Sequence, residues 1–324
     1  MLHTRRTFVT GTAAMLVLPA RSPAQTAAWP TRPLRIIIPT AAGGSPDLVS
    51  RQIGAKLTDR LGQPVLVESV TQGIGLVGNQ MVSKSAPDGY TLAMLTGGFT
   101  TQAAVMKTLP YDPVGGFSFV TTVVAYPMFL LVAPNSPIAS FRDLVERAKR
   151  EPGKVNIAII GNGSVYHLLS KWIENRADIT MAGIPYRGTV AAFTDVIGGR
   201  VDAMLDTATS AITRVKNVQL RALAVSSPES YPLMPDVPTM DATVPGIKLM
   251  SWLGLAAAPQ TPRPIIDQLN GEVRRALALP DVKQWLADTG VLAAPSTPEE
   301  FRGRIESEIE LYGKIVEANG IRPE

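Results

Sequence analysis

Residues 34–48 read LRIIIPTAAGGSPDL, a short branched apolar run followed by a glycine-rich loop and a serine–proline pair. The run from Leu34 to Pro39 is typical of a buried strand. Ser45-Pro46-Asp47 matches the cap and the first two positions of a helix, which we expect to continue to about Arg60. The stretch therefore predicts a strand, a tight loop and a helix in succession, which is the repeating unit of parallel α/β folds.

The same order returns in the middle of the chain, where KVNIAII at residues 154–160 precedes Gly161-Asn162-Gly163-Ser164 and a helix to about Arg176. Short apolar runs predict further strands, and a helix at 189–197 separates two of them. Strands that alternate with helices predict parallel sheets with helices on both faces. The further strands are expected at residues 64–68, 90–96, 179–185, 201–206 and 220–225.

Two apolar strands, at residues 126–134 and 251–259, can carry the chain between two such α/β units. The C-terminal helix keeps one apolar stripe, which most simply packs back on the first unit; its residues are Phe301, Ile305, Ile309 and Tyr312. We therefore expect an α/β protein of two domains. The expected boundaries are a signal peptide at 1–24, a discontinuous first domain at 25–126 plus 249–324, and a second domain at 127–248.

The N-terminus has a basic start, a short apolar run from Ala13 to Leu18 and small residues up to a cleavage site after Ala24, as signal peptides do. Thr4-Arg5-Arg6-Thr7-Phe8 favours the twin-arginine route, with an ordinary Sec signal as the alternative. Removing this segment leaves 28 basic against 27 acidic residues, so the formal charge falls from +4 to +1. We expect a periplasmic mature protein with no nucleic-acid partner, because the basic footprint of such proteins is missing.

Several classes of chemistry lack their residues. The chain has no cysteine, which excludes disulfides and thiol catalysis. After the signal peptide His167 is the only histidine, so a zinc site of several His or Cys ligands is excluded, and a Ser-His-Asp triad could act only through His167. We therefore expect no catalysis, no cofactor and no metal. We also expect no membrane insertion, because no later run has the 18 or so apolar residues of a membrane span. Catalysis through His167 is the alternative.

The stretch GIGLVG at residues 73–78 matches the G-x-G-x-x-G fingerprint of dinucleotide binding. That fingerprint requires its first glycine directly after a strand and an acid at the end of the next strand. Here Ser69 to Gln72 intervene, and the next strand ends in Thr96-Gly97-Gly98. We therefore interpret Gly75 and Gly78 as positions that let a helix approach the sheet closely.

Small polar loops follow the predicted strands at four places. Ligands of open α/β sheets bind outside the carboxyl ends of the strands, and backbone N–H groups at helix N-termini suit anions. A small molecule could be held by Gly43 to Ser45 at one carboxylate and by Asn162 to Ser164 at the other; the alternative is a set of ordinary, well-capped loops. The expected ligand residues are Thr40, Ala42, Gly43, Gly44, Ser45, Asp47, Thr96, Gly97, Gly98, Asn162, Gly163, Ser164, His167, Arg187, Gly188 and Asp206.

Some of these residues have a second interpretation. Arg187 could bind an anion in a bidentate manner or remain a solvated loop residue. Asp47 and Asp206 could accept a hydrogen bond from a ligand amine or hydroxyl, although Asp47 could equally serve only the helix dipole. We interpret three aromatic residues as packing residues, with lining of the ligand site as the alternative: Phe99, Tyr126 and Trp252.

A series of stretches runs in a fixed order from Trp29 nearly to the end: LRIIIPTAAGGSPDLVSRQIGAKL, APDGYTLAMLT, LPYDP, GNGSVYHL, PYRGTVAAFTDVIGGRVDAMLD, RALAVSSPESYPLMPDVPT and SWLGLAAAPQTP. In content and order they resemble the solute-binding proteins of tripartite tricarboxylate transporters, the Bug-type family. The resemblance implies a two-domain, Venus-flytrap periplasmic binding protein of type II-like fold with a ligand cleft between the domains. It implies capture of a small organic carboxylate and delivery to membrane transporter subunits.

The resemblance also places the site. It puts the first ligand loop on Thr40 to Asp47, the facing loop on Gly161 to Ser164, the third-strand loop on Thr96 to Gly98 and an acidic strand end on Asp206. Two stretches depart from the family pattern, Thr40-Ala41-Ala42 and Ser69 to Gly73, so the ligand could differ from the family's common ones. We expect a monomer that closes about a hinge. A secreted enzyme acting on such acids and a periplasmic sensory receptor are the alternatives.

Overall fold

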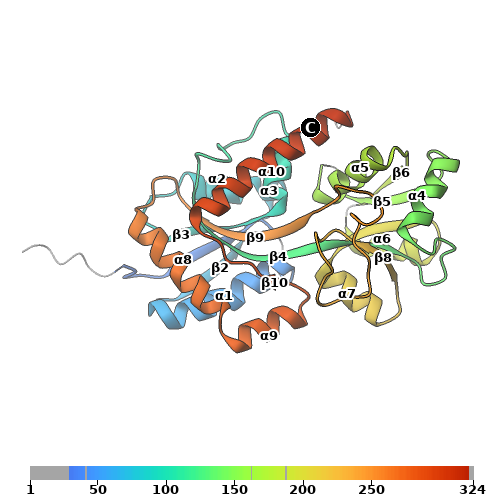
Figure 1. The fold of residues 1–324 in the computed structure, drawn as a ribbon. Coiled ribbons are helices and arrows are strands. Elements are labelled where there is room, and N and C mark those ends of the chain that lie inside the picture. The colour runs from blue at the N-terminus through green and yellow to red at the C-terminus, as the bar shows by residue number, and fades with distance from the viewer. Residues whose placement is uncertain (1–28, 41, 162, 187, 321–324) are drawn as a thin grey trace, which may run out of the picture.

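The computed structural model describes residues 29–40, 42–161, 163–186 and 188–320, so the predicted twin-arginine signal peptide lies outside the described residues. Strands and helices alternate along the chain (Figure 1). The strands are β1 Leu34–Ile38, β2 Val65–Ser69, β3 Thr91–Thr96, β4 Ser118–Val132, β5 Asn156–Ile160, β6 Ala182–Tyr186, β7 Ala203–Thr207, β8 Arg221–Val225, β9 Met250–Ala257 and β10 Leu292–Ala293. The helices are α1 Ser45–Leu61, the 3-10 turn η1 Gln72–Gly75, α2 Leu76–Ser83, α3 Gly97–Val105, α4 Phe141–Arg150, α5 Val165–Ala177, α6 Thr189–Ile197, α7 Ala208–Lys216, α8 Arg263–Leu277, α9 Pro280–Asp288 and α10 Pro298–Ala318.

The strands pair in one continuous order, β2-β1-β3-β9-β4-β7-β5-β6, and β8 and β10 each pair with β4. The pairs among β1, β2 and β3 are parallel, as are those among β5, β6 and β7, which confirms the parallel pairing expected from the strand–helix alternation. Strands β9 and β4 run antiparallel to their neighbours between these groups. We call β1–β3, β9 and β10 with α1–α3 and α8–α10 the first lobe, and β5–β8 with α4–α7 the second lobe.

Strand β4 runs through both lobes (Figure 1). Its residues 118–127 pair with β9, and its residues 128–131 pair with β7. Strand β9 begins at Met250, which lies opposite Pro127. The chain therefore passes between the lobes twice at nearly the same place, once in the middle of β4 and once at the start of β9.

Helices cover both faces of the first-lobe sheet (Figure 1). On one face, Ile53 of α1 and Leu269 of α8 share a core with Ile36 of β1. On the other face, Ile37, the next residue of the same strand, packs with Phe301 of α10. Alternate strand residues point to opposite faces, so the apolar residues of β1 serve two cores, and each such side chain contributes about 1.5–3 kcal/mol when fully buried.

The C-terminal helix α10 packs on the first lobe, as expected, and its C-terminal part also packs on the second lobe, which was not expected. Phe301 and Ile305 share a core with Trp252 of β9, whereas Tyr312 and Ile315 join the core of the second lobe. An apolar stripe identifies the buried face of a helix but not its neighbours. At 21 residues α10 is about 30 Å long, enough to reach across both lobes.

The glycines of GIGLVG bring α2 close to the first-lobe sheet, which confirms their interpretation as packing positions. Gly75 has a φ of +86°, and a Cβ on it would lie 2.3 Å from the Cβ of Pro39. A Cβ on Gly78 would lie 3.1 Å from a methyl group of Ile37. Neither position has room for a side chain without displacement of its neighbours.

Across the described segments, the structure contains no helix with both the length and the apolar character needed to cross a bilayer.

Candidate functional site

A cavity of about 360 Å³ lies between the lobes, and residues of both lobes line it. We call it the cleft pocket. Its first-lobe lining comes from the ends of β1 and β3 and from the start of β9, and it consists of Thr40, Ser45, Pro46, Thr96, Gly97, Gly98 and Ser251. Tyr126 of β4 lies at the passage between the lobes. The second-lobe lining consists of Val165, Tyr166, Thr189, Asp206, Thr207 and Ser210.

Five helices of the described chain begin at the cleft pocket. They are α1 and α3 from the first lobe and α5, α6 and α7 from the second lobe, and each contributes its cap or first-turn residues to the lining. The first turn of a helix leaves backbone N–H groups without helical partners, and the helix dipole places partial positive charge there. The pocket is therefore flanked from two sides by groups that suit an anion.

The fold brings several predicted ligand residues to this one cavity. They come from strand ends and helix starts that lie far apart in the sequence, and they are Thr40, Ser45, Thr96, Gly97, Gly98 and Asp206. The predicted loop at Thr96 to Gly98 differs in detail, because α3 begins at Gly97 directly after β3. The strand end and the helix N-terminus are thus adjacent residues at the pocket.

The other predicted residues flank this lining or lie outside the described residues. Ala42 to Gly44 form the exposed turn before Ser45, and Gly163 and Ser164 directly precede Val165 of α5. Gly188 is the N-cap of α6. Asn162 and Arg187 lie outside the described residues.

The two predicted serine caps have different outcomes. Ser164 is the N-cap of α5, where its Oγ accepts the backbone N–H of His167 at 3.4 Å, as expected. Ser45 is the first residue of α1, and Gly44 is the N-cap, so the predicted cap was one residue too late. The Ser45 hydroxyl instead points across the cleft to Oγ1 of Thr209 in the second lobe, at 3.4 Å.

Asp47 stabilises the turn before α1. Its Oδ2 accepts the backbone N–H of Gly43 at 2.9 Å, and its Oδ1 pairs with Nε of Arg51 at 2.8 Å. The Arg51 hydrogen bond and then the Gly43 N–H lower the pKa of Asp47. This carboxylate is therefore occupied by the preceding turn and by its own helix, at the helix start where an acid complements the dipole.

Thr40 lies two residues after the end of β1 and lines the cleft pocket. Its Oγ1 is buried and has no hydrogen-bond partner among the described residues. A buried hydroxyl without a partner costs about 1–3 kcal/mol. The pocket therefore offers a ligand one unsatisfied polar group, the Thr40 hydroxyl.

Asp206 lies at the end of β7 and is 1% exposed. Its Oδ2 accepts a hydrogen bond from Arg214 at 3.1 Å, and its Oδ1 accepts the backbone N–H of Thr207 at 2.8 Å. Burial raises the pKa of Asp206, and hydrogen bonding from Ser210 and the charge of Arg214 oppose this shift. Since the Asp206 charge is paired, the polar groups that the pocket offers a ligand are mainly hydroxyl and backbone groups.

Tyr126 and Ser251 face each other across β4 and β9 at the passage between the lobes, and both line the pocket. Burial raises the pKa of Tyr126, and its hydrogen bond with Ser251 opposes that shift. Of the three aromatic residues that we interpreted as packing residues, Tyr126 thus also meets the lining alternative. Phe99 and Trp252 are buried in the first-lobe core.

His167 lies in a different cavity, of about 430 Å³, between α5 and the strands β5 and β6. Its Nδ1 accepts the backbone N–H of Gly163 at 3.2 Å. Burial, and then the nearby charge of Lys171, lower its pKa, while Glu174 acts in the opposite direction. His167 therefore fixes the loop that precedes α5 through a hydrogen bond, and it does so in a cavity other than the cleft pocket. Among the described residues, no group of three or more His, Asp or Glu side chains is placed to bind a metal.

Several lining residues were not among those predicted from the sequence, namely Tyr166, Thr189, Thr207, Ser210 and Ser251. Thr189 and Thr207 directly follow predicted residues, so extending each predicted loop by one residue would have found them. Ser251 carried no signal as a ligand residue, because it lies at the start of an apolar strand and reaches the pocket only through the pairing of β9 with β4.

The sequence profile of the tripartite tricarboxylate transporter family receptor matches residues 49–321 of this chain. The match includes the starts of α3, α5, α6 and α7 and most of the lining of the cleft pocket. Thr40 and the N-terminal end of α1, which includes Ser45, precede the matched residues.

Three solved structures are similar to the whole fold. The periplasmic binding protein BugD has a TM-score of 0.78 and 28% identity, covering 91% of this chain and 100% of that one. MatC from Rhodopseudomonas palustris with bound malate has a TM-score of 0.77 and 29% identity, covering 89% of this chain and 100% of that one. R. palustris Rpa4515 with adipate has a TM-score of 0.82 and 28% identity, covering 91% of this chain and 100% of that one. These similarities confirm the expected α/β fold of a two-domain periplasmic binding protein.

Proposed function

The chain belongs to the tripartite tricarboxylate transporter receptor family, and from that premise we propose that it captures a small organic carboxylate in the cleft pocket for delivery to the membrane subunits of such a transporter. The observation that carries this proposal is the convergence of five described helix starts from both lobes on one cavity. The solved relatives that hold malate and adipate support the class of ligand.

The pocket suits a carboxylate for three reasons. Backbone N–H groups at helix starts are fixed in place, so they stabilise an anion with little reorganisation. Each dipole contributes about 0.3–1 kcal/mol at exposed sites and up to about 2 kcal/mol where partly buried. Asp206 would repel an anion if it were unpaired, but Arg214 balances its charge. The Thr40 hydroxyl adds a polar group that a ligand oxygen can satisfy.

We propose that ligand capture closes the lobes about the two adjacent segments, in the middle of β4 and at the start of β9, where the chain passes between the lobes. The proposed domains are 25–126 plus 249–324, and 127–248. Two observations support these boundaries: β4 exchanges β9 for β7 after Pro127, and β9 starts opposite that residue at Met250. Two short adjacent segments are the usual form of a hinge between ligand-binding domains. The contact of Ser45 with Thr209 already joins the lobes across the cleft.

We further propose that the protein is exported, most simply by the twin-arginine route, and acts in the periplasm as a monomer without a cofactor. The receptor role is favoured over an enzyme by the position of His167. The enzyme alternative would need His167 or an unpaired carboxylate as its base, and His167 holds Gly163 in a cavity separate from the cleft pocket.

Thermal unfolding of the purified mature protein with a panel of carboxylic acids tests the proposal. Malate and adipate are the first two acids to try, each compared with its neutral diamide. A ligand at 100 times its dissociation constant should add about 2.7 kcal/mol to the free energy of unfolding. The proposal requires that at least one acid raises the melting temperature and that its diamide does not. A panel of mono-, di- and tricarboxylates without any shift would refute it.

A further inference from the structure

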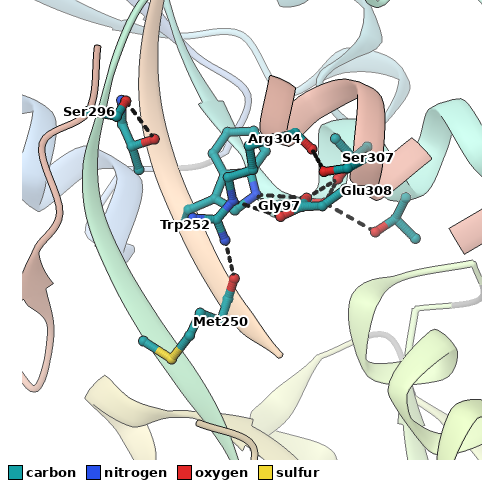
Figure 2. A network of polar contacts seen from close by, with 10 residues as sticks. Gly97, Met250, Trp252, Ser296, Arg304, Ser307 and Glu308 are labelled. Carbon is teal, nitrogen blue, oxygen red and sulfur yellow. Dashed lines mark hydrogen bonds and ion pairs between the residues drawn. The ribbon is translucent and has the colours of Figure 1, made fainter. Parts of the chain in front are cut away.

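Behind the cleft pocket, the carboxylate of Glu308 joins three elements of the first lobe (Figure 2). Glu308 lies on α10, and its side chain is only 13% exposed. It accepts a hydrogen bond from Oγ1 of Thr100 on α3 at 2.8 Å and from Nε1 of Trp252 on β9 at 2.9 Å. Arg304, one turn earlier on α10, donates its Nε to the same carboxylate at 2.7 Å. One largely buried carboxylate thus connects α3, β9 and α10.

The Thr100 contact lies next to the pocket. Thr100 is fully buried in the first turn of α3, three residues after Gly97, which lines the cleft pocket. Its hydroxyl lies 3.1 Å from the carbonyl of Gly97 and 2.8 Å from Glu308. A hydroxyl has one proton to donate, and a charged acceptor at the shorter distance takes it. Glu308 is therefore one residue removed from the pocket.

The start of α3 has few stabilising interactions of its own. It opens with Gly97 and Gly98, and glycine is the least favourable helix residue after proline. Thr96 is the N-cap, yet its side chain makes no capping hydrogen bond within the described structure. The absence of side chains at these glycines lets Gly97 approach the Ser251 hydroxyl, where a Cβ would lie 2.7 Å from Oγ. This turn therefore depends on contacts from outside the helix.

The same network reaches the passage between the lobes. Arg304 donates a second hydrogen bond, from its Nη2, to the carbonyl of Met250, which Figure 2 shows beside Trp252. Met250 is the first residue of β9 and lies opposite Pro127 of β4. The pair of Glu308 and Arg304 thus connects the pocket end of α3 with the point where the chain enters the first lobe.

We propose that Glu308 is a positioning residue for the cleft pocket: its carboxylate fixes the first turn of α3, with Gly97 and Gly98, against β9 at the passage between the lobes. It acts through Thr100 and touches no ligand. The consequence for binding rests on the proposed carboxylate function, whereas the effect on α3 does not.

Hydrogen–deuterium exchange of the mature protein without ligand tests whether Glu308 fixes the first turn of α3. In Glu308→Gln and in Thr100→Val, amides of residues 97–105 should exchange about tenfold faster than in wild type, because the first turn opens more often. Amides of α1 should be unchanged. Glu310→Gln is the matched control, since Glu310 lies on the same helix, is 70% exposed and pairs with Lys314. Wild-type exchange of residues 97–105 in both variants would overturn the proposal.

Calorimetric titration with malate and with adipate tests whether this contact affects ligand affinity. The affinity should fall about tenfold in Glu308→Gln and in Thr100→Val, in the range typical of residues that act through others. The double variant should lose little more affinity than either single variant, because both changes affect the same hydrogen bond between Thr100 and Glu308. Full affinity in both variants while α3 exchanges faster would overturn the positioning role. If wild type binds neither acid nor any other member of the panel, the carboxylate function fails, and the exchange experiment still decides whether Glu308 fixes α3.

Discussion

The backbone N–H of Gly163 donates to Nδ1 of His167 at 3.2 Å, so the one histidine among the described residues holds the loop that precedes α5. Nδ1 can accept this bond only while the imidazole is neutral. Burial and the nearby Lys171 lower the pKa of His167, which keeps it neutral in the folded protein at pH 7. The loop and the start of α5 are thereby sensitive to acid.

This relationship predicts a pH dependence. Because the folded pKa of His167 lies below its ordinary value of about 6.5, its contribution to stability is fully present above that value and is lost as the pH falls through the folded pKa. His167→Asn keeps an acceptor near Nδ1 but does not titrate. Urea unfolding should show a smaller loss of stability between pH 7 and pH 5 for His167→Asn than for wild type. Equal losses would contradict the role given to this bond.

Breaking the pair of Asp206 and Arg214 should destabilise the second lobe strongly. The two side chains are 1% and 15% exposed, so Asp206→Asn leaves a largely buried guanidinium without its counter-ion. Removing one partner of a buried pair costs about 3–5 kcal/mol, whereas an exposed pair is worth less than about 1 kcal/mol. Urea unfolding of Asp206→Asn, beside the exposed-pair variant Asp267→Asn, measures the difference. Similar small losses in both variants would show that Arg214 finds another partner.

Two glycines should respond in opposite ways to alanine. Gly75 combines a φ of +86° with a Cβ position 2.3 Å from Pro39, so Gly75→Ala should cost about 2 kcal/mol or more through strain and overpacking. Gly303 lies on the exposed side of α10, and apart from its chain neighbours and the nearby backbone of α10, no described atom would lie within 4 Å of its Cβ. Gly303→Ala should therefore add about 0.5–1 kcal/mol. Chemical denaturation of both variants checks the signs, and a stable Gly75→Ala would disprove the close approach of η1 to β1.

The sequence predicted the parts of the fold that depend on local chemistry. The runs Leu34 to Pro39 and Lys154 to Ile160 became β1 and β5 because branched apolar residues between turns favour buried strands. Ser164 became a cap because its hydroxyl reaches an N–H three residues later in any helix. Such signals extend over one turn or one strand, so a single sequence carries them.

Contacts between distant segments were not predictable in the same way. Tyr312 continues the apolar stripe of α10, but nothing in the stripe indicates that this end reaches the second lobe. His167 follows a predicted ligand loop, yet the helix turns it into a neighbouring cavity. Ser251 reaches the cleft pocket because β9 pairs with β4 opposite Tyr126. Each outcome depends on how two elements pack, and pattern and propensity do not specify that.

Gly44 allows binding to be separated from folding. It is the N-cap of α1 in an extended conformation, with φ −81° and ψ 169°, and it has no side chain to cap the helix. Aspartate and serine are both favourable at this position, so Gly44→Asp and Gly44→Ser should keep or slightly raise the stability. Only the aspartate adds a negative charge next to Ser45 at the rim of the cleft pocket.

Calorimetric titration of wild type, Gly44→Asp and Gly44→Ser with malate and adipate tests the central claim, that the helix starts at the cleft pocket bind a carboxylate. We expect wild type and Gly44→Ser to bind the same acid with similar affinity. We expect Gly44→Asp to bind that acid about tenfold or more weakly, which corresponds to about 1.4 kcal/mol of lost binding free energy. Equal affinity of a carboxylate for all three proteins would contradict the claim that these helix starts hold the ligand.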